Sequence, residues 1–80
     1  MPPTDEPPTE VDASGLTCPM PVIELAQAIE GVGVGDTVRL LATDPTARVD
    51  VPVWCRMRRH RLVSLEVDGD VLRFVVERTR

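Results

Sequence analysis

The 80-residue chain shows hydrophobic alternation with a period of two in three segments, over 37–43, 63–67 and 72–76. This period is typical of a strand with one buried face. The Asp68-Gly69 pair between the last two segments favours a tight turn, so these segments predict a β-hairpin. A shorter segment, 11–14, is interpreted as an edge strand. The pattern therefore predicts four strands in all.

A segment with helical periodicity lies between the strands predicted at 11–14 and 37–43. Four apolar residues recur there at i, i+3, i+4 and i+7, which gives a helix one buried face. They are Val22, Leu25, Ala26 and Ile29. The helix is expected to begin at Cys18 or Pro19 and to end near Gly31, since glycine is a common helix terminator.

A second helix is expected over 51–59, after a short helical turn at 46–49. The two are kept separate because Pro52 inside a continuous helix would cost about 3 kcal/mol. The order β-α-β-α-β-β predicts an α/β (α+β) two-layer sandwich with a four-stranded mixed sheet. Right-handed crossovers would place both helices on one face of that sheet, over the side that carries Val38.

Composition divides the chain into a tail, 1–10, and a single domain, 11–80. The tail contains four prolines and three acidic residues, which is typical of a flexible, extended segment. Trp54 and Phe74 are the only aromatic residues of the chain, so the core must be mainly aliphatic.

Charge and cysteine content narrow the function classes. The net charge is −4, which argues against nonspecific binding to nucleic acid. Two cysteines are too few for a disulfide scaffold. With no signal peptide and no apolar run of membrane length, we expect a cytoplasmic protein that does not bind membranes.

The segment Gly15-Leu16-Thr17-Cys18-Pro19-Met20-Pro21 precedes the first predicted helix. Cys18 at a helix start would face N–H groups without intrahelical partners, and the helix dipole favours negative charge there. We therefore expect a thiolate, the nucleophilic form of cysteine. Pro19 is expected at the first helical position and Pro21 in the first turn, while Gly15 gives the turn its freedom. Many cysteines merely fill cores, but this proline arrangement favours a reactive one.

The motif Gly-x-x-Cys-Pro-x-Pro resembles the signature of the TusA-like (SirA-like) sulfur-carrier family. The likeness covers about residues 11–78 and includes Asp44-Pro45, Asp50-Val51-Pro52, Trp54-Cys55 and His60. It implies a small α/β sandwich whose motif cysteine accepts a persulfide sulfur and passes it on. Cys18 would then be the catalytic, sulfur-carrying nucleophile.

The same resemblance implies the partners. The donor would be a cysteine desulfurase or a rhodanese-like protein, and acceptors in the family serve tRNA thiolation, cofactor assembly or sulfur oxidation. The only group implied on the protein is a transient persulfide on Cys18, with no cofactor. Met20 stands where some members of the family have an acidic residue.

Cys55 and His60 are the other residues with possible chemistry. Cys55, in the middle of the second predicted helix, is interpreted as a buried structural thiol. His60 is expected at the C-terminus of that helix, with a packing role or as an imidazolium that complements the dipole. Cys18, Cys55 and His60 lack the spacing of a metal site, so no metal is expected.

Arginines cluster at the end of the second predicted helix, namely Arg56, Arg58, Arg59 and Arg61. Such a cluster is either a solvated face or a docking patch for an acidic partner, and we take Arg56, Arg58 and Arg59 as the candidate partner-binding residues. Direct contact with RNA is not expected, because the chain lacks aromatic stacking platforms.

Three function classes remain open. No carboxylate pair stands near Cys18 with a defined spacing, which favours a carrier over a complete enzyme. The second class is a thiol redox or peroxide-responsive protein in which Cys55 resolves an oxidised Cys18. The third is a noncatalytic interaction module that acts through the basic patch at 56–61.

Overall fold

The computed structural model describes residues 9–80 and contains four strands and two helices. In chain order they are β1 (Thr9–Ala13), α1 (Met20–Glu30), β2 (Thr37–Ala42), α2 (Ala47–Arg58), β3 (Arg61–Asp68) and β4 (Val71–Glu77). Most of the predicted tail, 1–8, lies outside the described residues. The first strand begins at Thr9, two residues before the predicted start of the domain.

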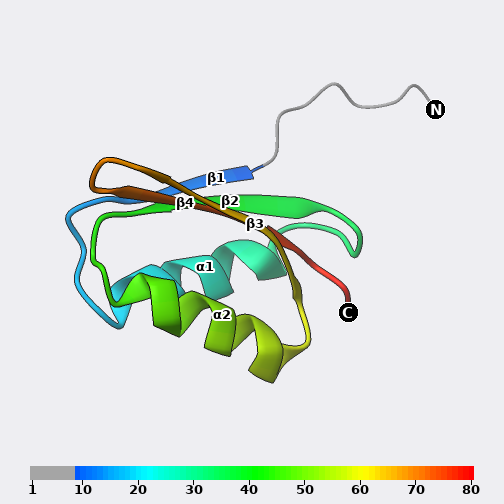
Figure 1. Ribbon diagram of the computed structural model, residues 1–80. Helices are drawn as coiled ribbons and strands as arrows, with labels where there is room; N and C mark the ends of the chain where they lie inside the picture. The colour runs from blue at the N-terminus through cyan, green and yellow to red at the C-terminus, as the bar shows by residue number, and fades with distance from the viewer. Residues whose placement is uncertain (1–8) are drawn as a thin grey trace.

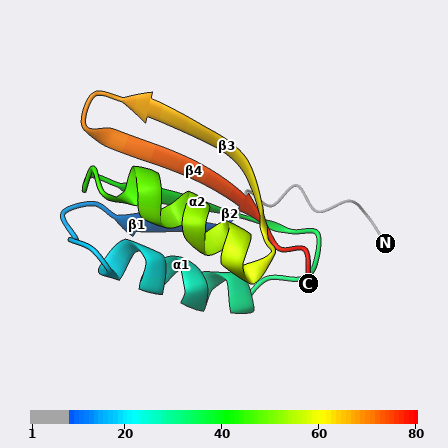
Figure 2. The ribbon, with the colours of Figure 1, turned by 60° about the horizontal axis from the view of Figure 1, so that its bottom comes forward.

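The strands form one mixed sheet in the order β1-β2-β4-β3. Strands β1 and β2 are parallel, whereas β4 is antiparallel to both of its neighbours. Both helices pack on one face of this sheet and run side by side in the same direction (Figures 1 and 2). The predicted two-layer α+β sandwich is therefore confirmed.

Alternation along the two central strands builds the core. The inward residues of β2 and β4 are all 5% exposed or less: Val38, Leu40, Ala42, Leu72, Phe74 and Val76. On the one face that the helices cover, Leu25 and Ile29 of α1 and Val51 and Cys55 of α2 belong to the same buried cluster. The alternating residues of the strands and the helical residues spaced by about 3.6 thus form one mainly aliphatic core, as expected from the sequence.

Strand β3 departs from the predicted alternation at its start. Val63 was expected to face inward with Leu65, but its side chain is 43% exposed. A register shift between Leu62 and Ser64 causes this, because Leu62 and Ser64 pair with the consecutive residues Val76 and Val75 of β4. Val63 is therefore the extra, unpaired residue of a bulge. Leu62 and Leu65 are the residues of β3 that pack against the core.

The hairpin between β3 and β4 turns one residue later than predicted. Asp68 pairs with Val71, so Gly69 and Asp70 form the two-residue loop. Gly69 has φ +60°, which costs a glycine little.

Helix α2 is continuous, and the predicted break before Pro52 is wrong. Pro52 lies inside the helix, where it removes one N–H donor but leaves the helical path intact. Val51 and Cys55 on either side of it are buried against the sheet. Their packing outweighs the local cost of the proline.

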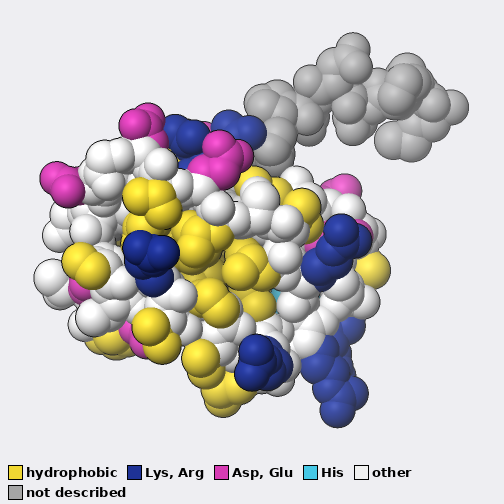
Figure 3. Space-filling model, viewed as in Figure 1, with side chains coloured by type: hydrophobic (Ala, Val, Ile, Leu, Met, Phe, Trp, Pro, Cys, Tyr) yellow, Lys and Arg dark blue, Asp and Glu magenta, His cyan; other side chains and the backbone are white. Residues whose placement is uncertain are grey.

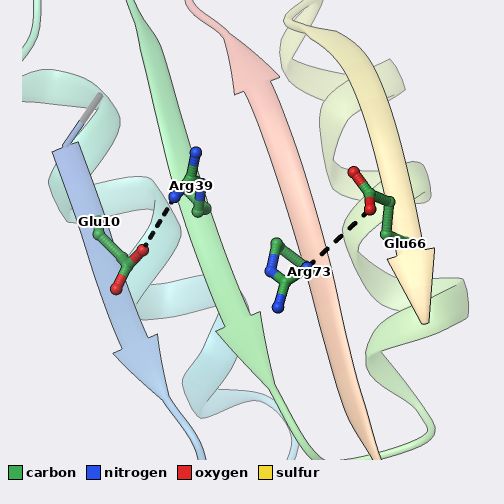
Figure 4. A network of polar contacts seen from close by, with 4 residues as sticks. All are labelled: Glu10, Arg39, Glu66 and Arg73. Carbon is green, nitrogen blue, oxygen red and sulfur yellow. Dashed lines mark hydrogen bonds and ion pairs between the residues drawn. The ribbon is translucent and has the colours of Figure 1, made fainter. Parts of the chain in front are cut away.

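The face of the sheet opposite the helices carries charged pairs. Figure 4 shows Arg39 of β2 paired with Glu10 of β1 at 3.4 Å, and Arg73 of β4 with Glu66 of β3 at 3.9 Å. Pairs exposed to this degree contribute between about 0 and 1 kcal/mol each. Among residues 9–80, neither helix is long and apolar enough to span a membrane.

Candidate functional site

Cys18 lies in the loop between β1 and α1, at the end of the molecule where β1 and β2 both finish and both helices begin (Figure 1). Gly15 starts this loop with φ +80°, as the sequence suggested. Its N–H donates to Thr43 Oγ1 at 2.8 Å, which ties the loop to the segment after β2. The parallel pairing of β1 and β2 is thus what brings the two loops together.

Asp44 fastens Cys18 to the start of α2. Its Oδ2 accepts the backbone N–H of Cys18 at 2.7 Å, and its Oδ1 accepts the N–H of Thr46 at 3.0 Å. These hydrogen bonds, that from Cys18 foremost, lower the pKa of the Asp44 carboxyl, because they favour its charged form. Asp44 enters the sequence analysis only within the family resemblance, so its contact with Cys18 is one that sequence reasoning missed.

Asp50 contacts the sulfur itself. The Cys18 thiol donates to Asp50 Oδ2, with Sγ and Oδ2 2.8 Å apart, across 32 residues of sequence. Asp50 lies in the first turn of α2, where a carboxylate complements the helix dipole. Cys18 is nevertheless exposed, so a partner can reach its sulfur.

The expectation of a thiolate stabilised by α1 is wrong. Helix α1 begins at Met20, after both predicted starts, so Pro19 is its N-cap and not its first helical residue as expected. The N–H of Cys18 already has a partner in Asp44. The hydrogen bond to Asp50 raises the pKa of Cys18, and desolvation and the charges of Asp50 and Asp44 add to it. The Thr46 hydroxyl acts in the opposite direction. The resting form is therefore a thiol bonded to a carboxylate.

Replacing Asp50 with asparagine should lower the pKa of Cys18, because the chief cause of its upward shift is removed. The rate of alkylation by iodoacetamide, which follows the thiolate fraction, should then rise at a lower pH than in the unmodified protein. Asp68→Asn, in the distant β3 strand, serves as the control and should leave the midpoint unchanged. An unchanged or higher midpoint in Asp50→Asn would contradict this assignment.

Cys55 is the buried structural thiol that its position predicted. It is 2% exposed on the inner face of α2, and burial raises its pKa to about 11. Both cysteines are free. The two thiols therefore differ in kind, one presented to partners and one enclosed by the core.

His60 packs as predicted but does not carry the predicted charge. Its ring lies 5.5 Å from that of Trp54, and its Nδ1 accepts the N–H of Thr79 at 3.3 Å. Desolvation, followed by the charges of Arg78, Arg80 and Arg58, lowers its pKa. The imidazolium role is wrong because desolvation and three nearby arginine charges disfavour the protonated ring. The backbone N–H of His60 performs the capping, to the Cys55 carbonyl at 2.9 Å.

The three candidate partner-binding arginines are all exposed, but they do not share one setting. Arg58 lines a cavity at the C-terminal ends of the helices, far along α2 from Asp50. Arg59 ends α2 in the left-handed conformation, with φ 62°. Arg56 lies in the last turn of the helix. Within residues 9–80, no group of three or more His, Cys, Asp or Glu side chains is arranged to hold a metal ion.

Comparisons with known proteins agree with this architecture. Residues 9–78 match the model of the family described as "Sulfurtransferase TusA". A protein of Archaeoglobus fulgidus named "Putative sulfur carrier protein" is 34% identical over 70 residues, which cover 88% of this chain and 96% of that protein. The crystal structure of a SirA-like protein from Desulfitobacterium hafniense superposes with a TM-score of 0.78 and 25% identity, covering 90% of this chain and 99% of the other. With its fold, its loop cysteine and these relatives in agreement, the chain belongs to the TusA family, a family of sulfur carriers.

Proposed function

We propose that this protein carries sulfur as a persulfide on Cys18, taking it from a donor protein and passing it to an acceptor. The observation that supports this most is the contrast between the two thiols. Cys18 is exposed in a loop held by Asp44 and Asp50, whereas Cys55 is enclosed with its pKa raised to about 11. An accessible sulfur on the surface suits a reaction in which the other reactant is a protein.

The loading step needs no oxidant. The Cys18 sulfur attacks the terminal sulfur of the donor persulfide, and a new Sγ–S bond forms as the S–S bond of the donor breaks. The donor cysteine leaves as a thiolate with the electron pair of that bond. Asp50, already the acceptor for the Cys18 thiol, takes the proton that Cys18 loses and passes it to the leaving thiolate or to water. The reverse exchange unloads the sulfur onto the acceptor.

Asp50 also keeps Cys18 in its thiol form between transfers, because it raises the pKa of that thiol. The thiolate is the form that oxidants attack, so a raised pKa limits oxidation between transfers. The same burial that raises the pKa of Cys55 removes it as a ready partner for a disulfide. The structure therefore favours a carrier over a Cys18–Cys55 redox pair.

The surface beside Cys18 is suited to protein contact. Met20 of α1 and Val49 and Val53 of α2 are 38%, 66% and 48% exposed, and they flank the loop and the start of α2. We propose that a desulfurase or rhodanese-like donor, and then the acceptor, dock over these residues. The acceptor reactions within this proposal are tRNA thiolation, cofactor assembly and sulfur oxidation, in the cytoplasm, where thiols stay reduced.

Incubation with a cysteine desulfurase and cysteine tests the proposal. Intact mass should increase by one sulfur atom per chain, and a reducing thiol should remove that sulfur. An unchanged mass, under conditions in which a known carrier loads, would contradict the proposal.

Arg56 and Arg59 are proposed to speed encounter with an acidic donor, since both are exposed and lie outside the cavity. The double variant Arg56→Gln/Arg59→Gln should load about threefold to tenfold more slowly at low ionic strength and approach the unmodified rate at high salt. Arg73→Gln, on the opposite face of the sheet, is the control. Equal rates and equal salt dependence in all three proteins would show that these arginines form only a solvated surface.

A further inference from the structure

A cavity of about 380 Å³ lies at the C-terminal ends of α1 and α2. Its polar and aromatic lining comes from Glu30, Trp54, Arg58, His60, Arg78 and Arg80. The two helices run in the same direction (Figure 2). The Cys18 loop lies at their N-terminal ends and the residues that line this cavity at their C-terminal ends. Helix α1 alone, with 11 residues, separates the two ends by about 16 Å. The cavity is therefore a second site, distinct from the sulfur-carrying loop.

Unpaired positive charge distinguishes this cavity. Arg58, Arg78 and Arg80 line it together with one acidic side chain, that of Glu30. In the described residues, 9–80, none of these three guanidinium groups forms an ion pair with an acidic side chain. Basic side chains gather at the end of the molecule that carries the C-terminus (Figure 3). A protein with a net charge of −4 thus concentrates cations at one hollow.

Arg78 is held in place before any ligand arrives. Its Nη1 donates to the carbonyl of Val32 at 2.5 Å and more weakly to that of Glu30 at 3.4 Å, and its Nε donates to the main-chain oxygen of Arg80, the last residue, at 2.9 Å. Among residues 9–80, no hydrogen bond uses the Nη2 of Arg78. A guanidinium group fixed in this way binds an anion with less loss of side-chain entropy.

An aromatic surface adjoins these charges. The rings of Trp54 and His60 lie 5.5 Å apart at 33°, and Ile29 and Met57 line the cavity beside them. A concave site with a few convergent charged groups is typical of small-molecule binding, and the volume of this mainly polar cavity falls within the usual range. Desolvation, followed by the charges of Arg78, Arg80 and Arg58, lowers the pKa of His60, so a positive potential acts on this ring.

We propose that this cavity binds a small organic anion, an aryl or heteroaryl group that carries a phosphate or a carboxylate. Arg58, Arg78 and Arg80 hold the anionic group, and the ring lies against Trp54. The proposal is independent of the chemistry at Cys18.

The chain provides two reporters inside the cavity, because Trp54 and His60 are its only tryptophan and histidine. Tryptophan fluorescence and the NMR titration of His60 can each be followed with phenyl phosphate, benzoate, inorganic phosphate and phenol as probes. The charged groups facing His60 are Arg58 from α2, Glu30 from α1, and Arg78 and Arg80 from the C-terminal segment.

Phenyl phosphate should change the Trp54 fluorescence saturably and raise the pKa of His60, since the bound anion offsets the arginine charges. Inorganic phosphate should raise this pKa with weaker affinity, and phenol should leave it unchanged. Comparison of phenyl phosphate with benzoate shows which anionic group the site prefers. The absence of a saturable response to both would overturn the proposal.

Matched variants locate the binding. Arg58→Gln/Arg80→Gln should weaken phenyl phosphate binding about tenfold, since two charged hydrogen-bond donors are lost. Arg56→Gln, on the same helix but outside the cavity, should bind as the unmodified protein does. Equal weakening in both variants would overturn the proposal, because it would indicate attraction to the overall charge. Sulfur loading in Arg58→Gln/Arg80→Gln is the separate readout for the proposed carrier function.

Discussion

Cys18→Ser is expected to lose sulfur loading completely. A serine hydroxyl cannot form the S–S bond that holds the transferred sulfur, so no slower route remains at this position. The fold should be unchanged, because Cys18 is exposed and a serine hydroxyl can still donate to Asp50. Intact mass after incubation with a desulfurase and cysteine should show no added sulfur, while circular dichroism and thermal unfolding match the unmodified protein.

Cys55→Ser is the matched control for this variant. It should load fully, although placing a hydroxyl at a site that is 2% exposed should lower the free energy of unfolding by about 1–3 kcal/mol. The assay is therefore best run well below the melting temperature. Loading by Cys18→Ser, or its failure in folded Cys55→Ser, would reverse the ranking of the two cysteines. A Cys18→Ser protein that keeps its full biological activity would favour the noncatalytic interaction module.

Phe74→Ala is expected to have the largest effect on stability. Phe74 is the largest fully buried side chain, and it lies on β4 between Leu40 of β2 and Leu65 of β3. Truncations of this kind cost about 3–5 kcal/mol, which is a large share of the 5–15 kcal/mol available to a typical domain. Urea denaturation should show a much lower midpoint or a protein that is unfolded without urea.

The control for Phe74→Ala is Val67→Ala, which removes methyl groups from a side chain that is 54% exposed on β3. Its midpoint should stay close to that of the unmodified protein, because exposed substitutions usually change stability by less than about 0.5 kcal/mol. Similar midpoints for the two variants would show that the core is not centred on Phe74.

Local periodicity was enough to predict the fold. Alternation over β2 and β4 identified their buried faces, and the helical spacing in α1 identified Leu25 and Ile29. The predictions failed where tertiary packing outweighed a local sequence rule. The bulge at Val63 cannot be seen in an alternating pattern, and Pro52 stays helical because its neighbours are buried against the sheet.

The site was predicted less completely because its partners are distant in sequence. Asp44 and Asp50 lie 26 and 32 residues from Cys18, and both enter the sequence analysis only within the family resemblance. The parallel pairing of β1 and β2 offered a signal, since the loops after two adjacent parallel strands share one edge. With that step, Asp44 could have been placed beside Cys18.

Both electrostatic errors concern groups whose charge states are inferred in the sequence analysis from the ends of their own helices. In the folded protein the hydrogen bond to Asp50 is the chief cause that raises the pKa of Cys18, whereas desolvation, followed by the charge of Arg78, lowers the pKa of His60. Neither cause can be inferred from the position of a helix end.

Peptide mapping after loading tests the central claim most directly. Cleavage after arginine separates Cys18, in the peptide 1–39, from Cys55, in the peptide 49–56. The carrier mechanism predicts one added, reductant-sensitive sulfur on the peptide 1–39 and none on 49–56. Sulfur on 49–56, or its absence from both peptides, would contradict it.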